Sequence, residues 1–157
     1  MRAEVQRLLC SRFAKAAWLV AYLWSVDIPV ARSQDVLTYH NGIARTGQNL
    51  TETILAPNNV NSTSFGKLFT LSVDGKVDAQ PLYVSNVAIS GQGTHNLLIV
   101  VTEHDSAYGF DADTGAQIWQ VSLLQSGETT SDPRSCGQVT PEIGMTATPV
   151  IDRTRGQ

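Results

Sequence analysis

The sequence is poor in cysteine, in charged residues and in long apolar runs. Only 2 cysteines occur among 157 residues, 16% of the residues are charged, and the formal net charge is −3. With 11 basic against 14 acidic residues, the chain lacks the basic surface that nucleic-acid binding requires, so we expect no nucleic acid among its partners. The sequence also lacks a Gly-rich phosphate loop, a serine nucleophile elbow and a zinc-type ligand spacing.

The amino terminus holds an apolar run, and that run is short. Basic residues precede Ala16–Val26, and Ala31-Arg32-Ser33 then offers small residues two apart. A basic region, a short apolar region and a small-x-small site are the parts of a secretory signal peptide, so residues 1–33 are predicted to be one, with cleavage after Ser33. The mature chain is then exported, to a periplasm or to the extracellular space. The run is well short of the ~20 residues that span a bilayer, so a permanent anchor is the weaker interpretation and no stable membrane span is expected.

Short apolar runs broken by turn residues predict an all-β fold. Leu97–Thr102, Ala107–Asp111 and Ala116–Val121 are each too short for a helix, and polar turns separate them. This is the pattern of a three-stranded antiparallel meander. Phe65–Val73 mostly alternates apolar and polar residues, which predicts a half-buried strand. Val77–Val84 is expected to be an inner strand, and the Ser90–Asn96 stretch a flexible loop.

An internal repeat suggests a second sheet. Ala79-Gln80-Pro81-Leu82-Tyr83-Val84 aligns with Ala147-Thr148-Pro149-Val150-Ile151-Asp152, so Ile143–Asp152 is predicted to be a strand equivalent to the inner one. Proline removes a ladder donor, which places Pro81 at a strand start or beside a central channel. Residues 34–64 are rich in Asn, Thr and Gly and are predicted to be an irregular wrapping segment, with Val36–Tyr39 as a candidate edge strand.

The turn from Asp111 to Gly115 is the most informative stretch. Asp111 and Asp113 can accept hydrogen bonds from backbone groups two residues on, and Gly115 supplies a positive φ without steric cost. Trp119 follows in the next strand, where its large flat ring suits docking between two neighbouring sheets. An ordinary β-hairpin in another all-β fold would show the same local features. Asp111, Asp113, Gly115 and Trp119 are therefore assigned structural roles.

Tyr108–Trp119 resembles the repeat of the quinoprotein (pyrroloquinoline quinone, PQQ) β-propellers, whose blades carry an Asp-x-x-Thr-Gly turn and a Trp-bearing last strand. Tyr39–Gln48 followed by Ile54–Val60 is similar to the opening of PQQ-dependent alcohol dehydrogenases. The resemblance implies an all-β, PQQ-type β-propeller over residues 65–157. A ring needs four to eight blades, so the chain is expected to be incomplete, with about one blade plus the start of a second. Its expected partners are the remaining blades of a longer chain or another protein.

The resemblance leaves three functions open. The first is an exported binding or scaffold module, since many propellers of this type bind no quinone. The second is the amino-terminal part of a PQQ- and calcium-dependent alcohol or sugar dehydrogenase, in which the quinone carries the redox chemistry. The third is a propeller that assembles other envelope proteins. The dehydrogenase function would bring PQQ and calcium as cofactors.

The resemblance also implies candidate cofactor contacts. Asp78 lies on the first inner strand, where an acidic residue contacts the quinone in some members of the family, and Glu142 would lie at the mouth of the channel. The family's adjacent cysteine pair is expected in the loop after Trp119, but this chain has Cys136 followed by glycine there, which puts a redox role in doubt. With residues 1–33 removed, Cys136 would also be the only cysteine, so no intrachain disulfide can form.

Histidines and carboxylates offer one further cluster. Glu103-His104-Asp105 could bind a divalent ion or move a proton, but consecutive residues of a tight turn point in different directions, so a solvated turn is the preferred interpretation. His40 and His95 are placed in loops without partners.

Overall fold

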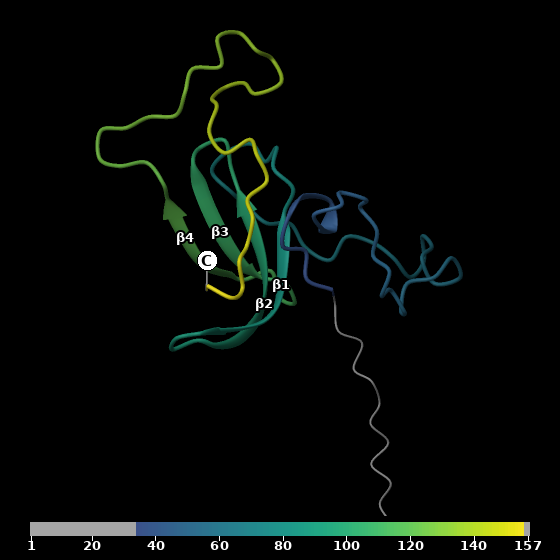
Figure 1. Ribbon diagram of the computed structural model, residues 1–157. Coiled ribbons are helices and arrows are strands. Elements are labelled where there is room, and N and C mark those ends of the chain that lie inside the picture. The colour runs from purple at the N-terminus through teal and green to yellow at the C-terminus, as the bar shows by residue number, and fades with distance from the viewer. Residues whose placement is uncertain (1–33, 156–157) are drawn as a thin grey trace, which may run out of the picture. The chain divides into compact units, whose positions relative to one another are not determined.

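The computed structural model describes residues 34–155, so the predicted signal peptide at residues 1–33 lies outside the described residues (Figure 1). Four strands form its regular structure: β1 (Leu82–Ile89), β2 (Gly93–Val101), β3 (Ser106–Asp111) and β4 (Gln117–Ser122). A single 3-10 turn, η1 (Tyr39–Asn41), precedes them. Among the described residues no helix is long and apolar enough to cross a membrane.

The four strands make one antiparallel sheet in the order β1-β2-β3-β4 (Figure 1). Each strand pairs with the next one along the chain, as in Leu98 with Phe110 and Tyr108 with Gln120. The prediction of an all-β fold is thus confirmed, and so is the three-stranded meander within it. The sheet is open, with β1 at one edge and β4 at the other.

The hairpin between β1 and β2 is longer than the sequence indicated. Residues from Gly93 onward already pair with β1, so the stretch predicted to be a flexible loop is reduced to a tight turn after Ile89. The prediction was wrong here because Thr94 and His95 lack the apolar alternation that marks a strand, whereas backbone pairing needs no apolar side chain. Pro81 directly precedes β1, a position in which its missing N–H costs no ladder bond.

One face of the sheet carries a compact apolar cluster. Val100, Tyr108 and Phe110 are buried there, and the Tyr108 and Phe110 rings stack with their centroids 5.6 Å apart. Leu71 and Val73 from the preceding segment pack against this cluster. The opposite face buries Leu82, Val84 and Leu97, whose side chains share that face because the register pairs Leu82 with Ile99 and Val84 with Leu97.

Phe65–Val73 is not a strand, which corrects the prediction made from its alternation. Leu68 is 89% exposed, whereas Leu71 and Val73 pack onto the sheet. The segment covers a face of the sheet with its side chains and gives no backbone hydrogen bond to a strand among the described residues. Alternation therefore indicated half-burial correctly from Phe69 to Val73 but not for Phe65 or Leu68, which are exposed, and it did not indicate strand pairing.

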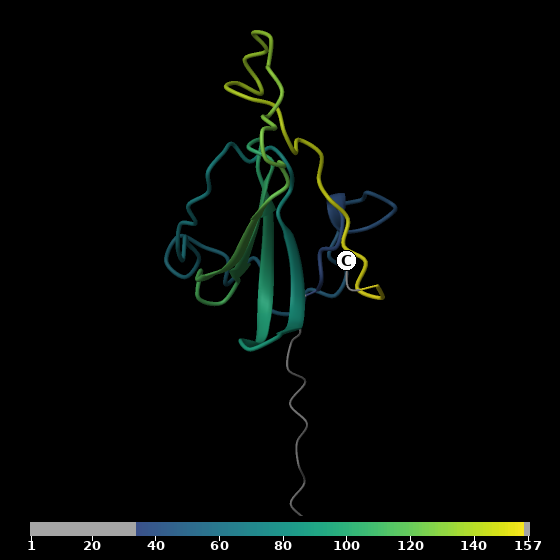
Figure 2. The same ribbon diagram turned by 90° about the vertical axis from the view of Figure 1, so that its left-hand side faces the viewer.

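Ile143–Asp152 also lacks strand pairing, which corrects the prediction of a second inner strand. Its backbone makes one isolated bridge, between Ser131 and Ile143, and single bonds from Met145 N to Thr102 O and from Ile151 N to Leu37 O. The candidate edge strand is likewise reduced to a single bridge between Val36 and Tyr83. A strand requires a partner over several residues, and the described part of the chain offers these segments no such partner. Figure 2 shows chain segments lying on both sides of the sheet.

Candidate functional site

The Asp111 turn is held by its own side chain. Asp111 Oδ1 accepts hydrogen bonds from Asp113 N (3.0 Å), Thr114 N (2.7 Å) and Thr114 Oγ1 (2.8 Å), and Gly115 N donates to Asp111 O (2.8 Å). Gly115 has φ 76°, the left-handed region that favours glycine. Asn96 Nδ2 donates to Asp113 Oδ2 (2.9 Å) and so ties the turn to β2. The turn is thus a rigid connection between β3 and β4.

His95 completes this turn from β2. Its Nδ1 donates to Asp111 Oδ2 (2.6 Å) and its Nε2 donates to Gln92 O (2.9 Å). Both partners are acceptors, so only the imidazolium can make both bonds. The hydrogen bond from His95, with those from Thr114, lowers the pKa of Asp111 to about 2, and the bond to Asp111 raises the pKa of His95. The expectation that His95 lies in a loop without a partner was therefore wrong.

Trp119 lies over a glycine of the neighbouring strand. The register pairs Trp119 with Gly109, and a Cβ built on Gly109 would lie 2.3 Å from Trp119 Cε2 and Nε1. Gly109 is thus required for the indole to lie flat against β3, and the ring is half-buried in that position. No sequence pattern indicated this pairing, because the residue that faces Trp119 is fixed only once the register is known.

The end of the sheet near the β2–β3 turn is built from polar side chains. Thr102 and Ser106 are buried, and their hydroxyls donate to the two carboxylate oxygens of Asp74. Asp74 N donates to the Tyr108 hydroxyl (3.0 Å). Burial raises the pKa of Asp74, but the hydrogen bonds from Ser106 and Thr102 outweigh it, so its pKa lies below the ordinary value. These bonds fix the Asp74 turn on the sheet.

Glu103 is buried, which overturns the interpretation of Glu103-His104-Asp105 as a solvated turn. Its Oε2 accepts hydrogen bonds from Gly144 N (2.7 Å) and Thr146 Oγ1 (3.0 Å), and its own N–H donates to Lys76 O (2.9 Å). A Cβ on Gly144 would lie 2.3 Å from Glu103 O, so the chain approaches the turn closely there. Glu103 therefore anchors the segment after residue 142 to the sheet.

His104 and Glu142 form an ion pair at the surface of the same turn. His104 Nδ1 lies 3.0 Å from both Glu142 oxygens, and Thr130 Oγ1 donates to Glu142 Oε2 (2.8 Å). The bonds from Thr130 and His104 lower the pKa of Glu142, and the bond to Glu142 raises the pKa of His104. The pair borders an acidic hollow of about 560 Å³ that Asp74 and Asp132 also line. Asp74 and Asp132 are the only other carboxylates among the described residues that line this hollow.

Asp78 lies in a different hollow, of about 420 Å³. It forms an ion pair with Lys76 (2.9 Å), and Tyr39, Arg45, Thr146 and Thr148 line the hollow with it. The residues lining the two hollows are entirely different, so the structure does not bring Asp78 and Glu142 into one site. Among residues 34–155 no group of three or more His, Cys, Asp or Glu is placed to hold a metal ion. The two candidate residues therefore do not fit a shared PQQ and calcium site.

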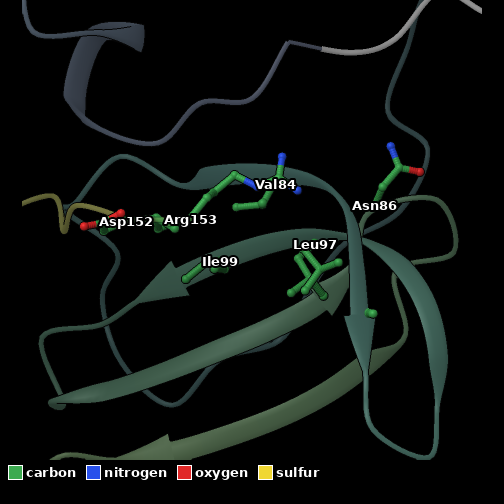
Figure 3. Close-up of a pocket in the computed structure, with 9 residues that line it drawn as sticks. Val84, Asn86, Leu97, Ile99, Asp152 and Arg153 are labelled. Carbon is green, nitrogen blue, oxygen red and sulfur yellow. The ribbon is translucent and has the colours of Figure 1, made fainter. Parts of the chain in front are cut away.

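An apolar hollow of about 340 Å³ lies on the face formed by β1 and β2 (Figure 3). Val84, Leu97 and Ile99 form its floor, and Asp152 and Arg153 lie at its side. Arg153 forms an ion pair with Asp35 and donates from Nη2 to Ser85 O (2.9 Å), which holds the chain beside β1. Cys136, the only cysteine among residues 34–155, is exposed and forms no disulfide there.

The His95–Asp111 pair and the burial of Glu103 were not predicted from the sequence, and only the first of them left a signal there. Extending the β2–β3 pairing of Leu97 with Asp111 by two residues brings His95 beside the Asp111 turn, so a hairpin register would have found that pair. The burial of Glu103 left no such signal, because its partners Gly144 and Thr146 are about 40 residues away in the sequence.

Comparison of the chain with protein-family models, with curated proteins and with solved structures gave no match.

Proposed function

We propose that this chain supplies one blade of an exported β-propeller of PQQ-repeat type, and that the propeller is a binding or scaffold module. The observation that carries the proposal is the sheet itself: four antiparallel strands in sequence order, with the Asp111 turn before a last strand that bears Trp119. A propeller blade is a four-stranded antiparallel sheet of this kind. The remaining blades would come from further residues of a longer chain or from a protein partner.

The apolar hollow over Val84, Leu97 and Ile99 supports the blade proposal. In a propeller each blade packs face to face on the next, so a blade by itself leaves part of such a face uncovered, as this hollow is. The neighbouring blade is the occupant that the proposal assigns to this hollow.

The scaffold role is preferred to the dehydrogenase role because of where the candidate cofactor residues lie. Asp78 and Glu142 line separate hollows, and each carboxylate is already engaged, with Lys76 and with His104 respectively. A dehydrogenase would therefore need its calcium ligands and catalytic base from other blades. A propeller that assembles other envelope proteins is a special case of the scaffold role.

The test is a titration of the full chain with PQQ in millimolar calcium, followed by quinone absorbance and by dye-linked alcohol oxidation. The scaffold proposal predicts no saturable PQQ binding and no turnover. It also predicts that an apolar fluorescent dye binds the hollow and that Ile99→Asp abolishes this binding, while Leu68→Asp on the opposite segment does not. Saturable PQQ binding that Asp78→Asn removes would contradict the scaffold role, and absence of dye binding would contradict the open blade face.

Export is tested separately. Expression of the full chain with its native amino terminus is expected to give a processed protein outside the cytoplasm that begins at Gln34. Amino-terminal sequencing of the product decides this, and an unprocessed cytoplasmic chain would contradict it.

A further inference from the structure

The two edges of the sheet differ in whether their outward backbone groups are hydrogen-bonded. At the β1 edge, Val36 and Tyr83 exchange two backbone hydrogen bonds (2.8 and 3.1 Å). Ser85 N then donates to Asp35 Oδ1 (2.8 Å), and Ser85 O accepts from Arg153 Nη2 (2.9 Å). The outward backbone groups of Tyr83 and Ser85 are thus satisfied, so this edge cannot accept another strand there.

The β4 edge is open. Leu123 N donates to Asp105 O (2.8 Å), and the register pairs Val121 with Ala107, so Val121 and Leu123 direct their backbone groups toward β3. In an antiparallel pair the residues between them direct theirs outward, which assigns Gln120 and Ser122 to the outer edge. Within residues 34–155 no backbone group pairs with this edge.

The β3–β4 register is irregular only at the start of β4, where Gly109 pairs with Trp119 but Phe110 pairs with Gln117. From Trp119 onward the β4 edge lacks the features that normally protect an edge strand. The residues from Gln117 to Ser122 include no charge and no proline. Val121 is 47% exposed and Leu123 is 56% exposed, on the same side of the strand. Charged side chains, proline and β-bulges are the usual means of preventing edge-to-edge pairing, and an uncharged, regular stretch of edge with exposed apolar side chains favours it.

We propose that this edge binds a second copy of the chain, through antiparallel pairing of β4 with β4 about a two-fold axis at Val121. In this register Gln120 of one copy faces Ser122 of the other, so their outward N–H and C=O groups form four hydrogen bonds across the axis. Val121 lies opposite Val121, and Leu123 lies opposite Trp119. The pairing does not depend on the blade's place in a propeller, because β4 is the last strand of the sheet in either case.

A second copy is the partner that β4 fits best because the strand is complementary to itself. Antiparallel self-pairing places like residues near the axis, which is unfavourable where they carry charge. Here the central residue is an exposed valine and its neighbours are uncharged, so the contact brings no like charges together and covers the exposed apolar side chains of Val121 and Leu123. An isologous contact of this kind closes at two copies.

Disulfide trapping in the full chain tests the register. In a background in which Cys10 and Cys136 are replaced by serine, Val121→Cys places two thiols opposite each other in a pair without hydrogen bonds, where Cα atoms lie about 4.5 Å apart. We expect mild oxidation to give a covalent dimer. Gln120→Cys is the matched control, since the two thiols that it introduces lie diagonally across the axis, about 7–8 Å apart, and should not be linked efficiently. Equal trapping at both positions, or none at Val121, would overturn the proposal.

Charge reversal tests the interface without cysteine chemistry. Sedimentation of the full chain should give twice its 17.0 kDa mass, and Val121→Lys and Val121→Glu should each weaken the dimer at least about tenfold, because like charges then face each other. Mixing the two variants should restore a dimer containing one of each. A monomeric parent chain, or variants whose mixture stays monomeric while far-ultraviolet circular dichroism shows the sheet intact, would overturn it.

Discussion

The contact between Trp119 and Gly109 predicts that Gly109→Ala destabilises the sheet when Trp119 is present and stabilises it when the indole is removed. A Cβ on Gly109 would lie 2.3 Å from two atoms of the indole, whereas ordinary contacts begin at 3.4 Å, so Gly109→Ala must displace the ring by about 1 Å. Overpacking of this kind costs about 1–3 kcal/mol. Alanine is better than glycine in a strand by roughly 0.5–1 kcal/mol, so the net destabilisation expected is about 1 kcal/mol at the middle of the two ranges and at most about 2.5 kcal/mol.

Removing the indole should change that result. In a Trp119→Ala background the three atoms nearest to the new methyl group are gone, so Gly109→Ala should stabilise the sheet by roughly 0.5–1 kcal/mol. Urea unfolding followed by far-ultraviolet circular dichroism measures both effects, with unchanged denaturant dependence as the check on two-state unfolding. The same sign of effect in both backgrounds would refute the placement of Trp119 over Gly109.

Three further predictions concern the turns and the core. Asp111 has its pKa lowered to about 2, so its contribution to stability is present above its ordinary value of 3.8 and is lost as the pH falls toward 2. The raised pKa of His95 makes a contribution to stability that is present below pH 6.5 and is lost as the pH rises through the raised pKa. Melting temperatures should therefore be highest between about pH 4 and 6.5. Asp111→Asn should flatten this pH profile, because it removes the carboxylate that both contributions require. Gly144→Ala should destabilise the chain by about 1–3 kcal/mol in urea unfolding, because its Cβ would lie 2.3 Å from a backbone oxygen of the β2–β3 turn; an unchanged midpoint would contradict that close approach. Leu82→Ala should cost about 2–5 kcal/mol because Leu82 is buried, whereas Leu68→Ala, at a side chain that is 89% exposed, should change the midpoint little; equal effects would contradict the assigned core.

Much of the sheet could be predicted from the sequence because strand and turn signals are local. The apolar runs after Leu97 and the Asp111 turn define two hairpins whose length leaves little choice of pairing. The same reasoning failed for Phe65–Val73 and for Ile143–Asp152, since alternation and an internal repeat report which side chains can be buried. They do not report whether a neighbouring backbone is present to pair with.

The candidate site was harder to predict because it depends on contacts between distant segments. Glu142 was singled out from its place before a supposed strand, but the partner that engages it, His104, lies 38 residues earlier and was assigned to a solvated turn. Glu103 was likewise assigned to solvent, although Gly144 and Thr146 bind its carboxylate. Contacts of this kind are set by how the segments fold over the end of the sheet.

The measurement that tests the central claim most directly is the cross-strand register of β3 and β4 in solution. In the antiparallel sheet, Tyr108 faces Gln120 and Ser106 faces Ser122 in pairs without hydrogen bonds between them, so their Hα protons lie close together. Nuclear Overhauser spectra of the labelled full chain should show strong Hα–Hα cross-peaks for both pairs. Cross-peaks displaced by one residue would move Tyr108 or Trp119 to the wrong face of the sheet. Their displacement or absence would contradict the four-stranded sheet on which the blade proposal rests.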